Sequence, residues 1–174
     1  ITVGAHILSI NGVLDDSFDK ANVSDKELLA VSSKAFCVIN DEIEDKMRAS
    51  VEKARLDGDS VGGVIECAVV DVPVGIGANI FSTVEGHISS ALFGVPAVKG
   101  VEFGAGFDFA KMTGYEANDT YSISNGNVKI NKNNNGGILG GMTTGAPIIV
   151  RAVVKPTPSI SKAQKSVNLQ KMTE

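Results

Sequence analysis

The pattern of apolar and polar residues along the chain predicts alternating strands and helices. Residues 2–10 place apolar side chains on both faces of an extended segment, which predicts a strand buried at least in part on both sides. Residues 64–70 form a mostly apolar run, so we expect a strand that is covered on both faces. Further strands are predicted at 98–103 and 147–154, and residues 25–39 are expected to hold a short helix or turn.

Two longer segments have the period of an amphipathic helix. Residues 41–57 repeat apolar positions at spacings of four, four and three, which gives one stripe: Ile43, Met47, Val51 and Ala54. Gly58 follows as the glycine expected just past a helix end. A second helix is predicted to begin near Ser82, because Ser82 and Glu85 have the spacing of a capping box, and to end at Gly94.

Polar residues dominate the segment 114–135. Within it, Asn125-Gly126 lies between two short apolar runs, which is typical of a β-hairpin with a type I′ turn. We expect Asn118-Asp119 to anchor a loop and Asn133–Asn135 to form a solvated loop. A short helix is expected just before this segment, at 107–113.

The predicted elements follow the order strand, helix, strand, helix, strand, hairpin, strand. This order predicts an α+β fold in which amphipathic helices pack against antiparallel sheet. The chain has 174 residues, which is enough for one domain with a substantial core. Neither an internal linker nor a repeat of fixed period is visible, so we expect residues 1–174 to form a single domain.

Composition argues against several classes of function. A net charge of −4 provides no basic field for nucleic acid or for an anionic membrane, and the low aromatic content of 5% argues against stacking on single-stranded bases. No apolar run reaches the length of a membrane span, and no signal peptide is visible. Cys37 and Cys67 lie among apolar residues, so we expect small buried side chains in a reducing cytoplasm and no metal site.

The main candidate for chemistry is a glycine-rich run followed by a proline-flanked lysine. Gly136–Gly141 contains four glycines in six residues, which lets the backbone approach a ligand closely. Lys155–Ile160 carries a cation and two hydroxyls, Thr157 and Ser159, on a segment stiffened by two prolines. Such donors suit an anionic group such as a phosphate. The alternative is a glycine-rich turn and a proline-rich exit from a strand, and the sequence leaves both open.

Other polar residues favour structural interpretations. His6 lies in a predicted strand and His87 on the polar side of a predicted helix, and neither has an acidic partner nearby in the sequence. We therefore expect structural or solvent roles for both. Lys99 and Arg151 are candidates for charge near a ligand, although exposure or ion pairing is the expected role. Asp59-Ser60 suits either a local turn or a loop beside an active site.

Several separate motifs, in the same order, are similar to those of chorismate synthase. The resemblance covers nearly the whole chain, tightly from residue 58 onward and loosely before it. Together these motifs are far more specific than any one glycine-rich loop. They are Gly58-Asp59-Ser60-Val61-Gly62-Gly63-Val64-Ile65-Glu66, Val72-Pro73-Val74-Gly75-Ile76-Gly77, Ile80-Phe81, Pro96-Ala97-Val98-Lys99-Gly100-Val101-Glu102-Phe103-Gly104, Gly106-Phe107, Asn118-Asp119, Asn135–Gly141 and Lys155–Ile160.

The resemblance implies an enzyme and a cofactor. The family catalyses the last common step of the shikimate pathway, in aromatic amino acid biosynthesis, and acts as a carbon–oxygen lyase on a phosphate ester. It eliminates phosphate from 5-enolpyruvylshikimate 3-phosphate to give chorismate, and it requires reduced FMN although no net redox change occurs. The resemblance also implies a cytoplasmic homotetramer with helices sandwiched between antiparallel β-sheets, and it leaves open whether NADP-linked flavin reduction is intrinsic.

Carried over by position, the resemblance implies that three segments bind the flavin. They are Pro96-Ala97, Gly140, and the run Lys155, Pro156, Thr157, Pro158 and Ser159. Pro96 matches less closely than Ala97, because other residues are admissible at its position. Lys155 suits either the cofactor phosphate or the reduced ring. We expect the glycine-rich run and the proline-flanked lysine to lie side by side, with the flavin across them.

The chain also departs from the family. Family members are considerably longer, and their two acid–base histidines, their Arg-rich substrate segment and their later Arg and Asp residues have no counterpart here. We therefore expect residues 1–174 to be a central, partial domain that is inactive alone, and we assign no catalytic residue. Two other hypotheses stay open: a non-catalytic flavin- or phosphate-binding module, and a structural remnant that only packs into an oligomer.

Overall fold

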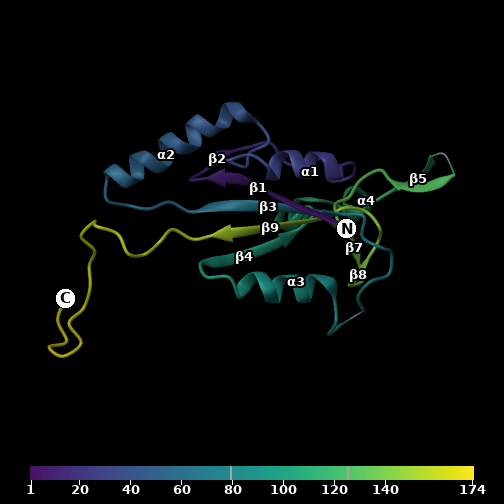
Figure 1. The fold of residues 1–174 in the computed structure, drawn as a ribbon. Coiled ribbons are helices and arrows are strands. Elements are labelled where there is room, and N and C mark those ends of the chain that lie inside the picture. The colour runs from purple at the N-terminus through teal and green to yellow at the C-terminus, as the bar shows by residue number, and fades with distance from the viewer. Residues whose placement is uncertain (79, 125) are drawn as a thin grey trace.

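One antiparallel sheet forms the centre of the molecule. A computed structural model describes residues 1–78, 80–124 and 126–174. The sheet has five strands in the order β2-β1-β3-β9-β4 (Figure 1). These strands are β1 (Thr2–Ile10), β2 (Val13–Leu14), β3 (Gly63–Val70), β4 (Val98–Phe103) and β9 (Ile148–Val154). The sheet strands predicted from the sequence are confirmed to within one residue, whereas β2 is too short to show a period.

Helices and two small hairpins complete the fold. The helices are α1 (Asp25–Ser32), the 3₁₀ turn η1 (Asp41–Ile43), α2 (Glu44–Leu56), α3 (Val84–Phe93), the 3₁₀ turn η2 (Gly106–Lys111) and α4 (Gly114–Ala117). The hairpins are β5 (Tyr121–Ser124) with β6 (Asn127–Ile130), and β7 (Ile138–Leu139) with β8 (Met142–Thr143). Helices α1 and α2 contact β1, and α3 contacts β4 (Figure 1). The predicted α+β class with antiparallel sheets is confirmed.

The ends of the helices follow from local capping. The helix predicted at 41–57 begins after its N-cap Asn40, whose side chain accepts a hydrogen bond from the Glu42 amide at 3.0 Å. Its first turn is a 3₁₀ turn, in which the Ile43 amide donates to the Asn40 carbonyl at 3.1 Å. Gly58 ends it in the left-handed region, with φ at 66°, as predicted. The second helix begins one residue later than expected, because Thr83 and not Ser82 is its N-cap. None of the helices in the described ranges combines the length and the hydropathy of a membrane span.

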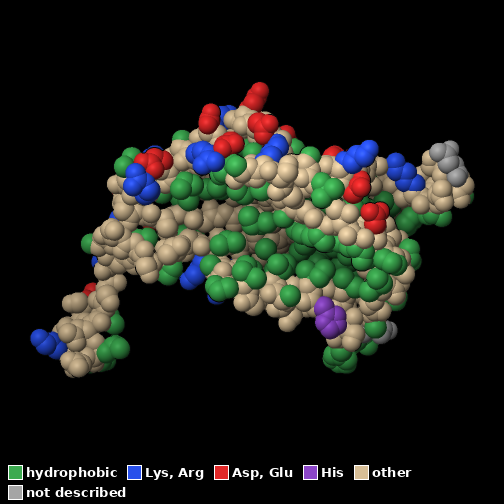
Figure 2. Space-filling model, in the orientation of Figure 1, with side chains coloured by type: hydrophobic (Ala, Val, Ile, Leu, Met, Phe, Trp, Pro, Cys, Tyr) green, Lys and Arg blue, Asp and Glu red, His purple; other side chains and the backbone are tan. Residues whose placement is uncertain are grey.

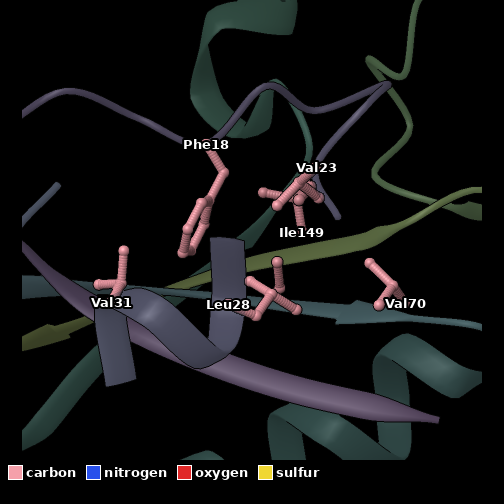
Figure 3. Packing of buried hydrophobic residues seen from close by; sticks show 7 residues of the cluster. Phe18, Val23, Leu28, Val31, Val70 and Ile149 are labelled. Atoms are coloured by element: carbon pink, nitrogen blue, oxygen red, sulfur yellow. The ribbon is translucent and has the colours of Figure 1, made fainter. Parts of the chain in front are cut away.

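The hydrophobic core lies between α1 and one face of the sheet. Leu28 is fully buried and sits directly on β1 at Gly4, where a Cβ would come within 2.6 Å of the Leu28 Cβ. This close contact explains why the strand carries glycine there. Burying each large apolar side chain contributes about 1.5–3 kcal/mol. The cluster contains Phe18, Val23, Leu28, Val31, Ala68, Val70 and Ile149 (Figure 3).

The opposite face of the sheet is less well covered. Val3 and Ile65 point away from α1 and keep 60% and 37% of their surface exposed. The prediction that both faces of these strands are covered is therefore only partly correct. Cys37 and Cys67 are free and half-buried rather than fully buried, and burial raises the pKa of the Cys67 thiol.

The stretch Asn133–Asn135 is not the solvated loop that its composition predicts. Asn133 is buried, and its side-chain amide donates to the carbonyl oxygens of Lys20 and Pro147, both at 2.7 Å. Its side-chain oxygen accepts from the Gly137 amide, also at 2.7 Å. A buried backbone group needs such a partner, and one asparagine supplies three of them.

The loop anchor predicted at Asn118-Asp119 is confirmed. The Asp119 carboxylate accepts hydrogen bonds from the backbone amides of Asn134 and Asn135, at 2.6 and 3.1 Å. The predicted hairpin is also present, because β5 and β6 pair in antiparallel register. Its expected turn at Asn125-Gly126 is only half described, since Asn125 lies outside the described residues, and Gly126 has a φ of 77°.

Candidate functional site

Two of the three predicted flavin-binding segments meet where β9 ends. The Lys155 amide donates to the Ala97 carbonyl at 2.9 Å, so the residue that follows β9 lies beside the residue that precedes β4. From there Lys155–Ser159 leave the sheet as an exposed segment, which we call the strap. Ala97 is half-buried and Pro96 is exposed. The resemblance grouped these segments, and the structure places Ala97 and Lys155 in contact, which nothing in one sequence reveals.

Ala97 has an unusual backbone. Its φ is 71°, a left-handed conformation that costs a residue with a Cβ about 1–2 kcal/mol. Glycine would adopt it without that cost. Strained non-glycine residues cluster at functional sites. Positive φ also occurs at Asp71 and Ile80, towards the other end of the sheet, so the strain at Ala97 supports a functional role only together with its contact to Lys155.

The strap lies on a bed formed by Gly58–Gly62, the turn after α2. The Ser60 hydroxyl donates to the Thr157 carbonyl at 2.7 Å. A Cβ on Gly62 would lie 2.6 Å from the Val154 carbonyl oxygen and 2.9 Å from the Pro156 Cδ. Only glycine at position 62 therefore lets the strap pass this close. The bed thus lies beside the candidate site. A loop beside an active site is one of the two roles that the sequence left open for Asp59-Ser60.

The far end of the strap is anchored to the C-terminal end of α2. The amides of Ser161 and Lys162 both donate to the Gly58 carbonyl, at 2.9 and 3.2 Å. The Lys162 ammonium also contacts the carboxylates of Asp57 and Asp59. The hydrogen bonds from the Lys162 ammonium to Asp57 and Asp59 raise the pKa of Lys162. The bond from Lys162 is also the main reason why the pKa of Asp59 is lowered. The anchor follows the predicted binding residues directly and was not found from the sequence.

An apolar cavity of about 500 Å³ borders the bed. It lies between α2 and the strands β1 and β3, and Arg55, Asp59 and Ser60 line it beside apolar groups. Val51 of the predicted apolar stripe stays 41% exposed and faces this space, whereas Met47 in the same stripe is fully buried. The apolar lining includes Ile7, Ile10, Val51, Ala54, Ile65 and Val154.

The glycine-rich run lies at the other end of β9. Gly140 is in the turn that joins β7 to β8, before β9 begins, whereas Lys155 follows its last residue (Figure 1). The extended strand between them has seven residues and spans roughly 20 Å. The prediction that the two elements lie side by side within one copy of the chain is therefore wrong.

Backbone geometry accounts for the glycines of this run. Gly140 and Gly141 have φ of 58° and 84° between the paired residues Leu139 and Met142, as a two-residue hairpin turn requires. A Cβ on Gly137 would lie 2.5 Å from the Pro147 carbonyl oxygen, whereas a Cβ on Gly140 would meet nothing within 4 Å. The alternative of a glycine-rich turn thus explains much of this segment.

A buried ionic network crosses the sheet between the two ends. His6 is 1% exposed, and its two ring nitrogens lie 3.0 Å from carboxylate oxygens of Asp15 and Glu66. Glu66 also accepts from Arg151, which pairs in turn with Glu102 at 3.0 Å. Burial alone would raise the pKa of Glu66, but hydrogen bonds from His6, the Phe18 amide and Arg151 outweigh burial and lower it.

This network confirms the structural role predicted for His6 and the ion-pair role predicted for Arg151. The partners of His6 lie nine and sixty residues away, so no local pattern could reveal them. His87 and Lys99 are exposed, as expected. In the part of the chain that the structure describes, no cluster of three or more His, Cys, Asp or Glu side chains is arranged to hold a metal ion.

Comparison with known proteins identifies the family. A family profile described as "Chorismate synthase" matches residues 1–174. The chorismate synthase of Korarchaeum cryptofilum is 50% identical over 131 residues, which cover 75% of this chain and 36% of that protein. The enzyme named chorismate synthase from Lancefieldella parvula is 41% identical, covering 99% of this chain and 48% of its own length.

Solved structures give the same result. A crystal structure of a chorismate synthase superposes with a TM-score of 0.79 at 32% identity, and the match covers 88% of this chain and 49% of that one. The chain spans between about a third and a half of the relatives it matches. Sequence, profile and fold agree, and the chain belongs to the chorismate synthase family.

Proposed function

We propose that this chain is the central portion of a chorismate synthase. The complete polypeptide would be a carbon–oxygen lyase of the shikimate pathway that converts 5-enolpyruvylshikimate 3-phosphate to chorismate with reduced FMN. Family membership supports this activity, and the chain's share of its relatives' length supports the proposal that further segments complete the enzyme. On this proposal the isolated chain binds flavin and is catalytically inactive.

The observation that carries the proposal is the meeting of Ala97, the strap and the bed beside an apolar cavity. An anionic group needs cations and donors, and the strap offers the Lys155 ammonium and the exposed hydroxyls of Thr157 and Ser159. A planar ring needs apolar walls, and the cavity next to the bed has the volume of a small-molecule site. The residues present therefore fit FMN.

The role of each part follows from its chemistry. When bound, reduced FMN would supply transient electron density, which side chains cannot provide. Lys155 would stabilise negative charge beside the flavin, and the strap prolines would keep its donors in place before binding. The apolar cavity would exclude water, which strengthens each of these electrostatic contacts.

Proton transfer would be supplied by a segment of the complete enzyme other than these 174 residues. His6 uses both ring nitrogens within the buried network, and His87 is exposed on α3. Neither histidine lies beside the strap or lines the neighbouring cavity. General acid–base catalysis requires a group within hydrogen-bond reach of the reacting atom, so we place that group in another segment of the complete enzyme.

We further propose a homotetramer in which a second copy brings Gly140 to the flavin. This arrangement would reconcile the implied role of Gly140 with its position at the opposite end of β9. Large apolar side chains are exposed around that end, and Figure 2 shows hydrophobic groups gathered there and along the sheet. Contiguous exposed apolar surface marks interaction sites. Residues with 41% to 95% exposure in this region are Val74, Ile76, Ile80, Phe81, Leu139 and Met142.

Localisation and partners follow from the same proposal. A biosynthetic enzyme with this substrate would act in the cytoplasm, and flavin reduction would draw on NADPH directly or through another protein. The net charge of −4 supports the absence of nucleic-acid and anionic-membrane partners.

Titration with reduced FMN tests the proposed site. We expect a saturable change in flavin absorbance with the 174-residue chain, and no change would favour a structural remnant. Turnover is then measured for the chain alone and for the chain supplied with the N-terminal segment of a relative.

The two activity measurements separate an enzyme from a binding module. We expect no turnover by the chain alone and partial turnover after the segment is supplied. Binding without turnover in both cases would favour a non-catalytic flavin-binding module. Turnover by the chain alone would contradict the placement of the acid–base groups elsewhere.

A further inference from the structure

We propose that Lys162 is a positioning residue that holds the strap in its ligand-binding conformation. This inference rests on the proposed function, because the strap is the proposed flavin-binding segment. Lys162 lies three residues beyond Ser159, outside every segment that the resemblance assigns to the flavin.

The strap depends on its two ends for its shape. All five of its residues are exposed, so apolar burial does not hold them. At one end the Lys155 amide binds the Ala97 carbonyl, and near the middle the Thr157 carbonyl accepts from Ser60. Ordering each residue of a chain costs about 1–2 kcal/mol in backbone entropy. A few contacts therefore decide whether the strap is ordered before ligand binds.

Lys162 makes a charged contact at the second end. Its ammonium bridges Asp57 and Asp59, which flank the Gly58 carbonyl that accepts the strap's backbone bonds. An isolated surface ion pair contributes little. Here the Lys162 ammonium contacts two carboxylates, and two backbone amides bind the Gly58 carbonyl that lies between those carboxylates in the sequence. Together these contacts connect the C-terminal end of α2 to the strap.

Electrostatics gives Lys162 a second effect on the same site. Asp57 and Asp59 are two negative charges at the C-terminal end of α2, where the helix dipole is also negative. Lys53 and Arg55 also lie in this last turn, and Arg55 is paired with Glu52. Lys162 is the cation that contacts Asp57 and Asp59, so without it the field of these carboxylates would face a strap that is proposed to bind an anion. Because its ammonium already contacts both carboxylates, Lys162 is not the group that binds the ligand.

Backbone dynamics of the ligand-free chain test the inference directly. In the Lys162→Met variant we expect the ¹⁵N order parameters of Thr157 and Ser159 to fall below about 0.6. The amide hydrogens of Ser161 and of position 162 should also exchange faster with solvent. Lys165→Met removes an exposed lysine three residues further on and is the matched control. Amides of β3 should be unchanged in both variants, which excludes general unfolding.

Flavin affinity gives the second readout. We expect Lys162→Met to weaken binding of reduced FMN about three- to tenfold, with a larger loss at low ionic strength. Lys162→Arg should restore both affinity and order, because it keeps the charge. In the double variant Asp57→Asn/Asp59→Asn, adding Lys162→Met should change flavin affinity and strap order little further.

The outcomes separate this inference from the proposed function. If the strap of Lys162→Met stays as ordered as in the unchanged chain, or if Lys165→Met has the same effect, the inference is wrong. If the unchanged chain has an ordered strap but binds no reduced FMN, the proposed flavin site fails, while the role of Lys162 in ordering the strap stands on the dynamics alone.

Discussion

The two ends of β9 differ in what their residues need. At the first end, Gly140 and Gly141 have the positive φ that a tight hairpin turn requires, and Gly137 packs against backbone. These glycines are explained by the fold alone. At the second end, Lys155–Ser159 are exposed, rest on a glycine bed and adjoin a strained Ala97.

The difference shows that a glycine-rich motif does not by itself indicate a binding site. Glycines that satisfy local geometry need no ligand, whereas an exposed strap that carries a cation and is fixed at both ends has no evident role in packing. The structure therefore directs attention to the second end as the site for an anionic ligand.

The largest effect is expected in the network that supports both ends. Glu66→Gln leaves His6 and Arg151 without their shared carboxylate, so we expect the free energy of unfolding to fall by about 3–5 kcal/mol. Urea denaturation measures it. Glu52→Gln, which removes an exposed carboxylate paired with Arg55, should hardly change stability. Equal losses would contradict the importance assigned to the buried network.

The same carboxylate predicts a pH dependence. The Glu66 pKa is lowered in the folded protein, so the unfolded state binds more protons near its ordinary value of 4.5. The stability that Glu66 contributes is present above that pH and is lost as the pH falls through the lowered value. Urea denaturation midpoints, measured from pH 7 down to the acid transition, should therefore fall less steeply with decreasing pH in Glu66→Gln than in the unchanged chain.

A matched pair of glycine substitutions tests the structural role of the first end. Gly137→Ala combines a positive φ with a clash against the Pro147 carbonyl, so we expect a loss of about 3 kcal/mol. Gly140→Ala meets nothing within 4 Å and should cost only about 1 kcal/mol from its φ. Thermal and urea unfolding measure both, and a larger loss for Gly140→Ala would show that its surroundings differ from the turn described.

Removing the strap's cation tests the functional role of the second end. Lys155→Gln should weaken reduced-FMN binding by about 1.5–3 kcal/mol, because a charge-assisted hydrogen bond is lost. Stability should hardly change, since Lys155 is exposed. Lys99→Gln, on the neighbouring strand β4, is the control and should bind as the unchanged chain does.

The smallest effect is expected at Ala97. Ala97→Gly relieves a left-handed φ of 71° and should raise the free energy of unfolding by about 1 kcal/mol. If the strain serves the site, this variant should also bind reduced FMN more weakly, because a flexible glycine holds the neighbouring Lys155 less firmly. A gain in stability with unchanged affinity would make the strain incidental.

The sequence predicted the elements well because their signals are local. The period-two strands, the stripe on 41–57 and the hairpin near Asn125-Gly126 all arise within a few residues of one another. The glycine after α2 was found for the same reason. The N-cap of α3 was misplaced by one residue, since Ser82 and Thr83 are both good caps and only the fold selects between them.

The remaining features depend on contacts between distant residues. The bed at 58–62 and the strap are about a hundred residues apart in the chain, and His6 meets Glu66 only through strand pairing. The resemblance to a family grouped Ala97 with Lys155, and the hydrogen bond between them agrees. It also grouped Gly140 with them, which a single copy of the fold does not do.

Whether the strap binds the flavin can be measured by amide NMR during titration with reduced FMN. If it does, saturable chemical-shift changes are expected at Ala97 and at the non-proline residues of Lys155–Ser159. Changes confined to the turn between β7 and β8, or saturable flavin binding with no change along the strap, would contradict binding by the strap.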